Sequence, residues 1–193
     1  MQLATITAGI LIALSLEGVR ESFQHRALVR EARENIRREM ADNQREVDGE
    51  LAGVAVGRKR LEAALEWAQA RLATKKTEIH ELNVNFSLAE LSSANWLTAE
   101  RTGALSLMDY AEVQRYAKVY NMQELYSQQQ LQAVEHVAAT GILFVGFGDP
   151  DADPLTEVEV FRDHVRGLIA NLAINEQLGH RISELYKKTL EEQ

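Results

Sequence analysis

Residues 29–54 read VREARENIRREMADNQREVDGELAGV, and this stretch decides the fold class. Apolar and small side chains recur in it at alternating spacings of three and four residues, which is the period of one helix face. Charged side chains occupy the other faces, as in an amphipathic helix that packs against partner helices. The sequence therefore predicts a helix-seam interface, a line of side chains facing other helices, made of Ile36, Met40, Asn43 and Val47.

The same pattern extends in both directions without a proline, so one long helix is predicted over about 20–74. Gly49, Gly53 and Gly57 fall inside it at four-residue spacing. Each glycine costs a helix interior about 1 kcal/mol relative to alanine, so three of them need a reason. Close approach of a neighbouring helix and a bend both remain open.

Two further helices are predicted from their start and stop signals. Ser87 with Glu90 is a capping-box pattern, which favours a helix over about 88–102 that ends at Gly103. Asp109 is a suitable N-cap for a helix over about 109–147. These two helices are expected to run back together toward the N-terminus.

A second capping-box pattern, Thr156 with Glu159, favours a last helix over about 156–191. Few prolines and many unbranched side chains favour helix throughout. The predicted fold is all-α: an N-terminal transmembrane helix that continues into the long amphipathic helix, packed in an antiparallel helical bundle or coiled coil. The expected division is a transmembrane helix at 1–19 and a helical soluble domain at 20–193.

The transmembrane prediction comes from residues 3–16, LATITAGILIALSL, which carry no charge. With its flanks the stretch covers roughly 27 Å as a helix, against a hydrocarbon core of about 30 Å. A cleaved signal peptide is disfavoured, because no basic residue precedes the stretch and no small-x-small site ends it. A buried core helix remains an alternative. A face for membrane helix packing is predicted at the small residues Thr5, Gly9 and Ala13, although chance spacing would also explain them.

Arginines follow the apolar stretch at once. Basic residues crowd the cytoplasmic flank of a membrane helix, where anionic lipids attract them. The net charge is +2 over residues 1–76 and −10 over residues 77–193. A bacterial inner-membrane protein with a cytoplasmic body is therefore expected, with a periplasmic body as the alternative. The juxtamembrane, lipid-facing residues are predicted to be Arg20, Arg26, Arg30, Arg33 and Arg37.

Several function classes are disfavoured. The overall net charge of −8 argues against nucleic-acid binding, and the absence of cysteine excludes disulfides and thiolate sites. The chain contains neither a nucleophile elbow nor the Glu-x-x-His or HExxH patterns of metal-binding helices. Residues 149–154, DPDADP, resemble the start of a calcium loop but place proline where glycine is required, so a solvated acidic turn is the better interpretation. No catalytic residue, metal or cofactor is predicted.

Two stretches resemble a widespread family of uncharacterised bacterial single-span membrane proteins. The first, residues 9–47, joins a GILIAL-type helix to a charged helix with an E-x-x-x-N segment, here Glu39 to Asn43. The second, AERTGALSLMDYAEVQRYAKVY, covers residues 99–120. The sequence departs from the family at Leu16-Glu17-Gly18, where polar and aromatic residues usually close the span. The resemblance implies an anchored helical protein and no activity.

We therefore expect a membrane-anchored, non-enzymatic helical scaffold or accessory subunit that acts through protein–protein contact. Its expected partners are the lipid bilayer and either other membrane protein subunits or a second copy. The alternative is a metal-dependent enzyme or sensor that uses dispersed Asp, Glu and His side chains inside the bundle.

Overall fold

The computed structural model describes residues 2–74, 88–146 and 154–192, with side chains described for 16–74, 88–138 and 155–192. The described residues form helices and short loops without a strand, which confirms the all-α prediction. The elements, in chain order, are α1 (Gln2–Thr74), α2 (Ala94–Arg101), the 3-10 helix η1 (Ala104–Leu107), α3 (Tyr110–Gly146) and α4 (Pro154–Glu191).

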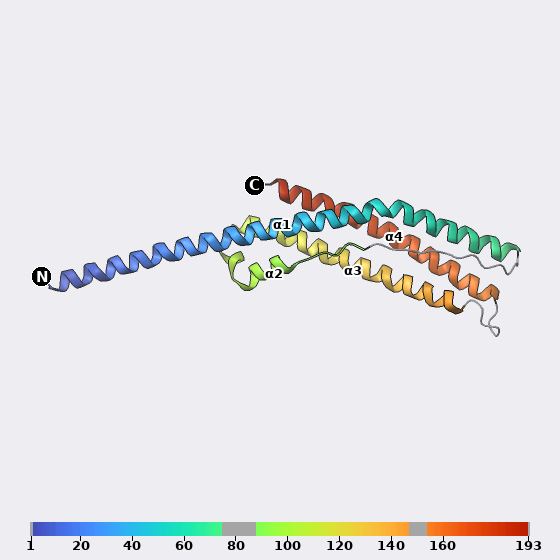
Figure 1. Ribbon diagram of the computed structural model, residues 1–193, viewed down its shortest axis with the longest axis horizontal. Coiled ribbons are helices and arrows are strands. Elements are labelled where there is room, and N and C mark those ends of the chain that lie inside the picture. Colours follow the sequence, from blue (N-terminus) through green and yellow to red (C-terminus); the bar gives the residue numbers. More distant parts are fainter. Residues whose placement is uncertain (1, 75–87, 147–153, 193) are drawn as a thin grey trace.

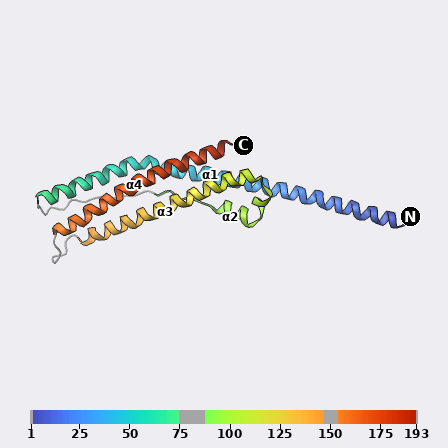
Figure 2. The same ribbon diagram turned by 180° about the vertical axis from the view of Figure 1, so that it is seen from behind.

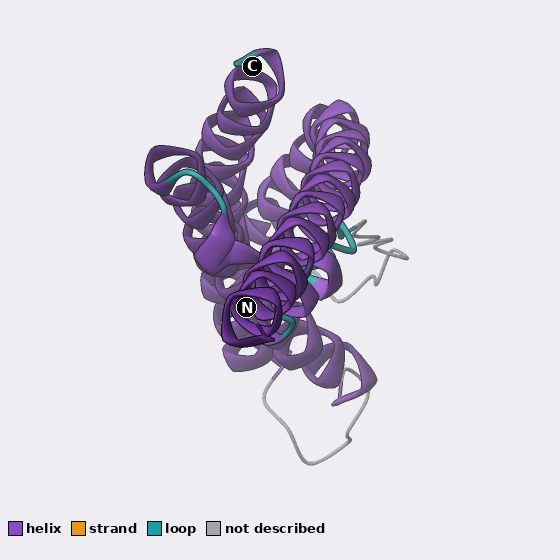
Figure 3. Ribbon diagram, turned by 90° about the vertical axis from the view of Figure 1, so that its left-hand side faces the viewer, coloured by secondary structure: helices purple, strands orange, loops and turns teal. Residues whose placement is uncertain are grey.

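The three long helices form an elongated bundle, from which the first part of α1 projects alone (Figures 1 and 2). The second part of α1 and the whole of α3 run in the same direction, and α4 runs antiparallel to both and packs closely against each. Figure 3, seen from the N-terminal end, shows this projecting part in front of the bundle. We call residues 2–27 of α1 the arm.

The predicted course of the chain was wrong in one respect. The helices at 88–102 and 109–147 were expected to return together toward the N-terminus, but α3 ends beside the end of α1, far from the arm (Figure 1). Residues 88–93, which lie outside any helix and which we call the strap, run back along α1. Its hydrogen bonds run from Glu50 of α1 at Ala89 to Asn43 at Ser92, so the strap lies antiparallel to α1.

The predicted helix ends hold at some positions and fail at others. Asp109 accepts backbone N–H bonds from Ala111 (2.9 Å) and Glu112 (3.1 Å), which confirms its N-cap role for α3. Gly103 has φ +77°, a left-handed conformation that glycine adopts at little cost, and it follows the end of α2 as predicted. The capping box after Ser87 starts no helix at residue 88, because buried side chains of α1 bind the backbone of the strap.

The interior divides into two apolar clusters along the bundle. The proximal core, nearest the arm, contains Ile36, Met40 and four buried tyrosines, including Tyr120, whose ring stacks on Trp96 at 5.1 Å. The distal core is built from smaller and aliphatic side chains of α1 and α4 around Phe161, which meets Trp67 edge to face at 5.7 Å. Both tryptophans therefore pack between elements of the fold.

Close helix approach does not explain the glycines of α1. A Cβ atom built at Gly49, Gly53 or Gly57 would meet no neighbour within 4 Å. Figure 1 shows α1 changing direction in its middle part, which agrees with the bend that the sequence left open. Gly179 of α4 is different, since its Cβ would lie 3.0 Å from Leu51 and 3.3 Å from the Tyr126 hydroxyl.

Candidate functional site

The described side chains of the arm are exposed to solvent. From residue 16 to residue 27 every side chain is exposed except that of His25, which is half-buried. Three large apolar side chains are among them: Leu16 is 65% exposed, Val19 53% and Phe23 65%. The first residues of α1 to pack against the proximal core are Leu28 and Val29. No element of the bundle covers this apolar surface in the described part of the chain.

The side chains of Thr5, Gly9 and Ala13, predicted as a face for membrane helix packing, lie outside the described residues, as do the side chains of residues 3–15. The backbone there continues the α1 helix. Among the residues whose side chains are described, no helix contains a stretch both long enough and apolar enough to cross a bilayer.

The five predicted lipid-facing arginines separate into two groups. Arg20, Arg26 and Arg30 are exposed, as a juxtamembrane position requires. Arg33 and Arg37 bind other elements of the bundle, a role that the sequence did not predict. Helical periodicity places Arg26, Arg30, Arg33 and Arg37 on one side of the helix, but it cannot identify acceptors that lie far away in the chain.

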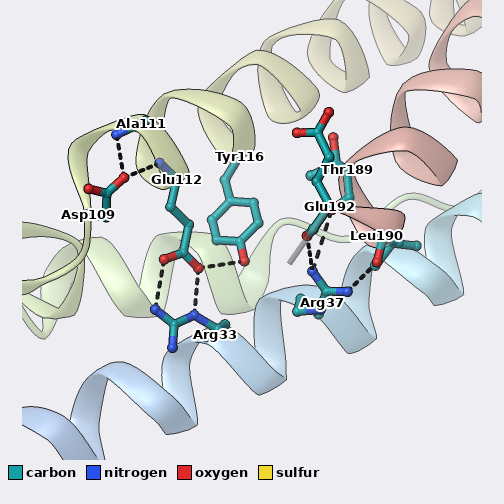
Figure 4. Close-up of polar contacts among 9 residues, drawn as sticks. All are labelled: Arg33, Arg37, Asp109, Ala111, Glu112, Tyr116, Thr189, Leu190 and Glu192. Atoms are coloured by element: carbon teal, nitrogen blue, oxygen red, sulfur yellow. Dashed lines mark hydrogen bonds and ion pairs between the residues drawn. The ribbon is translucent and has the colours of Figure 1, made fainter.

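Arg33 forms a bidentate pair with Glu112 in the first turn of α3, at 2.6 Å and 2.7 Å (Figure 4). Tyr116 donates its hydroxyl proton to the same carboxylate at 2.8 Å. The hydrogen bond from Arg33 holds the pKa of Glu112 below its usual value, and burial raises the pKa of Tyr116. The pair therefore fastens the start of α3 to α1.

Arg37 performs the corresponding role at the end of α4. Its guanidinium group donates to the backbone carbonyls of Thr189 (3.4 Å), Glu192 (3.3 Å) and Leu190 (Figure 4). The last carbonyls of a helix have no partner within the helix, so an arginine from a neighbouring element satisfies them and also complements the helix dipole. Arg33 and Arg37 together hold two helix ends at the base of the arm.

A buried polar network lies deeper in the proximal half, and Glu39 stands at one end of it. This residue is 4% exposed, and its carboxylate accepts hydrogen bonds from the Tyr120 hydroxyl (2.6 Å), the Ser92 hydroxyl (2.8 Å) and the backbone N–H of Asn95 (2.8 Å). The backbone N–H of Trp96 adds a longer bond at 3.4 Å. Two of these donors are backbone groups at the start of α2, so Glu39 positions that helix.

Glu50, 7% exposed, binds the other end of the strap. Its carboxylate accepts from the backbone N–H of Ala89 (3.0 Å), the Tyr126 hydroxyl (2.7 Å), Gln130 (2.6 Å) and Asn175 (2.7 Å). It thus joins the strap, α3 and α4 to α1. The Oδ1 atom of Asn175 is buried without a hydrogen-bond partner in the described structure.

Asn43 pairs with the strap in the manner of a neighbouring strand. Its amide donates to the Ser92 carbonyl at 2.7 Å and accepts from the Ser92 N–H at 2.9 Å. Gln123 donates to the same carbonyl at 2.9 Å and accepts from Asn43 and from the Tyr186 hydroxyl. Because a buried polar group is stable only when it is hydrogen-bonded, these side chains fix one register of the strap.

These contacts leave little chemistry available. The two buried carboxylates are occupied as acceptors, and burial raises the pKa of Tyr120, Tyr126 and Tyr186, so the phenols remain protonated donors. Within the described residues no three His, Asp or Glu side chains gather in a way that could hold a metal ion. The network joins the strap, α2, α3 and α4 to α1.

The predicted helix-seam residues lie inside this bundle. Ile36, Met40 and Val47 are fully buried and Asn43 is 2% exposed. The strap, α2, α3 and α4 of the same chain cover them, so the seam is not free for another protein. The sequence identified Asn43 as a seam residue and Glu39 only as part of the E-x-x-x-N segment. It gave no indication of Glu50 or of its partner Tyr126.

A cavity of about 700 Å³ lies between the base of the arm and η1. Arg26 and His25 contribute basic groups to it. Leu107 of η1, which is 41% exposed, contributes an apolar wall. His25 also lies 3.7 Å from Glu21. The full lining is Gly18, Glu21, Ser22, His25, Arg26, Val29, Arg33 and Leu107.

Comparison with known proteins adds no identity. No protein-family model, no curated protein and no solved structure matches the chain.

Proposed function

We propose that the protein is a membrane-anchored, non-enzymatic helical scaffold or accessory subunit, tethered through residues 1–19 and acting through protein–protein contact. The bundle would lie at the cytoplasmic face of a bacterial inner membrane, with other membrane protein subunits or a second copy as its partners. The family resemblance of residues 9–47 and 99–120 is part of the same proposal, because it implies an anchored helical protein.

The observation that carries the proposal is the exposure of the arm. Leu16, Val19 and Phe23 are all more than half exposed, on a part of α1 that no other described element covers. Exposing three large apolar side chains along one helix is unfavourable in water, because burial of each would stabilise the protein by about 1.5–3 kcal/mol. Leu16 is the last residue of the uncharged stretch 3–16, and Val19 and Phe23 follow it. A bilayer would solvate both.

A role by contact is supported by how the polar side chains of the bundle are used. The buried carboxylates of Glu39 and Glu50 each accept four hydrogen bonds. Three of those to Glu39 come from the Ser92 hydroxyl and the α2 backbone. One of those to Glu50 comes from the strap backbone at Ala89. Such groups stabilise one arrangement of the chain. Exposed apolar side chains of the bundle, such as Leu131 and Ile174, would then be available for contact with a partner.

Membrane fractionation tests the anchor. The full chain and a chain that begins at Gly18 are expressed in bacteria, and the membranes are washed with alkaline carbonate. We expect the full chain to stay in the membrane pellet until detergent is added, and the shortened chain to leave it. A full chain that is released by carbonate, and that stays monodisperse without detergent, would contradict the anchor.

Photocrosslinking in native membranes tests the contact role. A benzophenone side chain is placed at Leu131 or Ile174, exposed apolar positions on α3 and α4, and at Leu16 for comparison. A scaffold predicts discrete crosslinked bands from the bundle positions, either to a second copy or to one partner. Crosslinks to lipid from Leu16, with no protein adduct at any tested bundle position, would leave the anchor standing and count against the scaffold.

A further inference from the structure

We propose that the cavity at the base of the arm binds the headgroup of an anionic phospholipid. This inference rests on the proposed membrane anchor, since it requires the cavity to lie at the bilayer surface. The ligand is identified by its chemistry, a phosphodiester with an apolar tail. The site is built from Arg26, His25 and Ser22 of α1 and Leu107 of η1.

The position of the cavity along α1 fits contact with a lipid headgroup. If the hydrocarbon region ends near Val19, Arg26 lies about 10 Å farther along the helix axis at about 1.5 Å per residue. A headgroup layer is roughly 5–8 Å thick on each side of the bilayer. Side chains on a helix lean toward its N-terminus, so the guanidinium of Arg26 reaches back toward the headgroups.

The charges around the cavity are arranged for an anion. Arg26 has no hydrogen bond or ion pair with any other described residue, so its donors are available, whereas the neighbouring Arg33 is neutralised by Glu112. At about 100° per residue Glu17 lies on the opposite side of the helix from Arg26. Glu21 lines the cavity together with Arg26, and its carboxylate lies 3.7 Å from His25. A phosphate would accept charge-assisted hydrogen bonds from Arg26.

The shape of the cavity favours a lipid over a free anion. Gly18 is the lining residue nearest the uncharged stretch, and a Cβ there would meet nothing within 4 Å, so the cavity is open on that side. Val29 and the exposed side of Leu107 form apolar walls. An acyl chain could leave along Gly18 beside the exposed arm, whereas a free phosphate would gain nothing from these walls.

Native mass spectrometry of the detergent-solubilised full chain tests the site. The probes are dihexanoyl phosphatidylglycerol, dihexanoyl phosphatidylcholine and inorganic phosphate. We expect phosphatidylglycerol to bind with 1:1 stoichiometry and Arg26→Gln to raise its Kd about tenfold, the loss typical of one charge-assisted hydrogen bond. Arg38→Gln is the matched control, because Arg38 is an exposed arginine of α1 outside the cavity that bonds Asn35. It should leave the Kd unchanged.

Three outcomes would overturn the site: equal binding of phosphatidylglycerol to the Arg26→Gln and unsubstituted chains, equal binding of both lipids, or inorganic phosphate binding as tightly as the lipid. The last outcome would indicate a general anion site. Carbonate extraction of the Arg26→Gln chain separates the two proposals. If the chains stay in the membrane but do not prefer phosphatidylglycerol to phosphatidylcholine, only the headgroup site is contradicted. If the unsubstituted chain is released by carbonate, the anchor is contradicted.

Discussion

The arm and the remainder of α1 belong to one continuous helix but have opposite surroundings. Between residues 32 and 71 a regular line of α1 side chains is buried under α3, α4 and the strap, and the charged side chains at its edge find partners. Between residues 16 and 27 the helix is equally regular, yet its apolar side chains face outward. The comparison teaches that helical periodicity identifies an apolar face of a helix. Whether that face is covered by the rest of the chain or by a lipid bilayer cannot be read from the periodicity.

Removing a network carboxylate should have the largest effect on the buried side of this comparison. Glu50→Ala leaves the donors of Ala89, Tyr126, Gln130 and Asn175 without their acceptor, which should destabilise the fold by about 3–5 kcal/mol. Urea unfolding in mild detergent, followed by circular dichroism, measures the loss. A change below about 1 kcal/mol would mean that water replaces the carboxylate and that the network does not hold the strap.

Two glycine substitutions should act in opposite directions within the bundle. Gly179→Ala places a methyl group 3.0 Å from Leu51 and should destabilise the fold by about 1–3 kcal/mol. Gly53→Ala meets no neighbour and should stabilise α1 by up to about 1 kcal/mol. Thermal unfolding of the two variants checks the pair. Destabilisation by Gly53→Ala would show that the bend of α1 requires glycine at this position.

The Arg33–Glu112 pair makes the base of the arm sensitive to acid. Because the folded-state pKa of Glu112 lies below its usual 4.5, the pair contributes stability that is complete above that value and is lost as the pH falls through the folded pKa. The difference in unfolding free energy between the unsubstituted chain and Glu112→Gln should thus be constant from about pH 7 to 5 and shrink below about pH 4. A difference that grew on acidification would reverse the assigned sign.

The smallest effect on stability is expected in the arm. Phe23→Ser removes a side chain that contacts no core cluster, so the free energy of unfolding of the bundle should change by less than about 0.5 kcal/mol. Val29→Ser, six residues on, removes a contact with the proximal core and should destabilise the bundle measurably. Equal losses in the two variants, measured by urea unfolding, would place Phe23 inside the fold and erase the contrast.

Much of the bundle could be predicted because its signals are local. The spacing of Ile36, Met40 and Val47 indicates a buried face. Asp109 indicates a helix start because its side chain caps the helix, and Gly103 indicates a helix end because it lacks a side chain. The strap could not be predicted in the same way. Its capping pattern at Ser87 and Glu90 favours helix, and the α1 side chains that bind it lie 39 to 53 residues earlier in the chain.

The candidate site shows the same division. Exposure of Arg20, Arg26 and Arg30 follows from the abrupt change of composition after residue 16. Arg33 and Arg37 share the stripe of Arg26 and Arg30, but their acceptors lie 79 and more than 150 residues away. The cavity beside Arg26 depends on where η1 packs, which no local pattern encodes.

The central claim is that the start of α1 is solvated by lipid. The chain has no cysteine, so single nitroxide labels can be attached at Ile10→Cys, Phe23→Cys and Arg45→Cys without background. With the full chain in phospholipid vesicles, electron paramagnetic resonance compares collisions with oxygen, which concentrates in lipid, and with a nickel chelate, which stays in water. We expect oxygen to dominate at position 10, both to contribute at position 23, and nickel to dominate at position 45. Nickel dominating at position 10, or both reagents failing to reach it because protein covers it, would contradict the account.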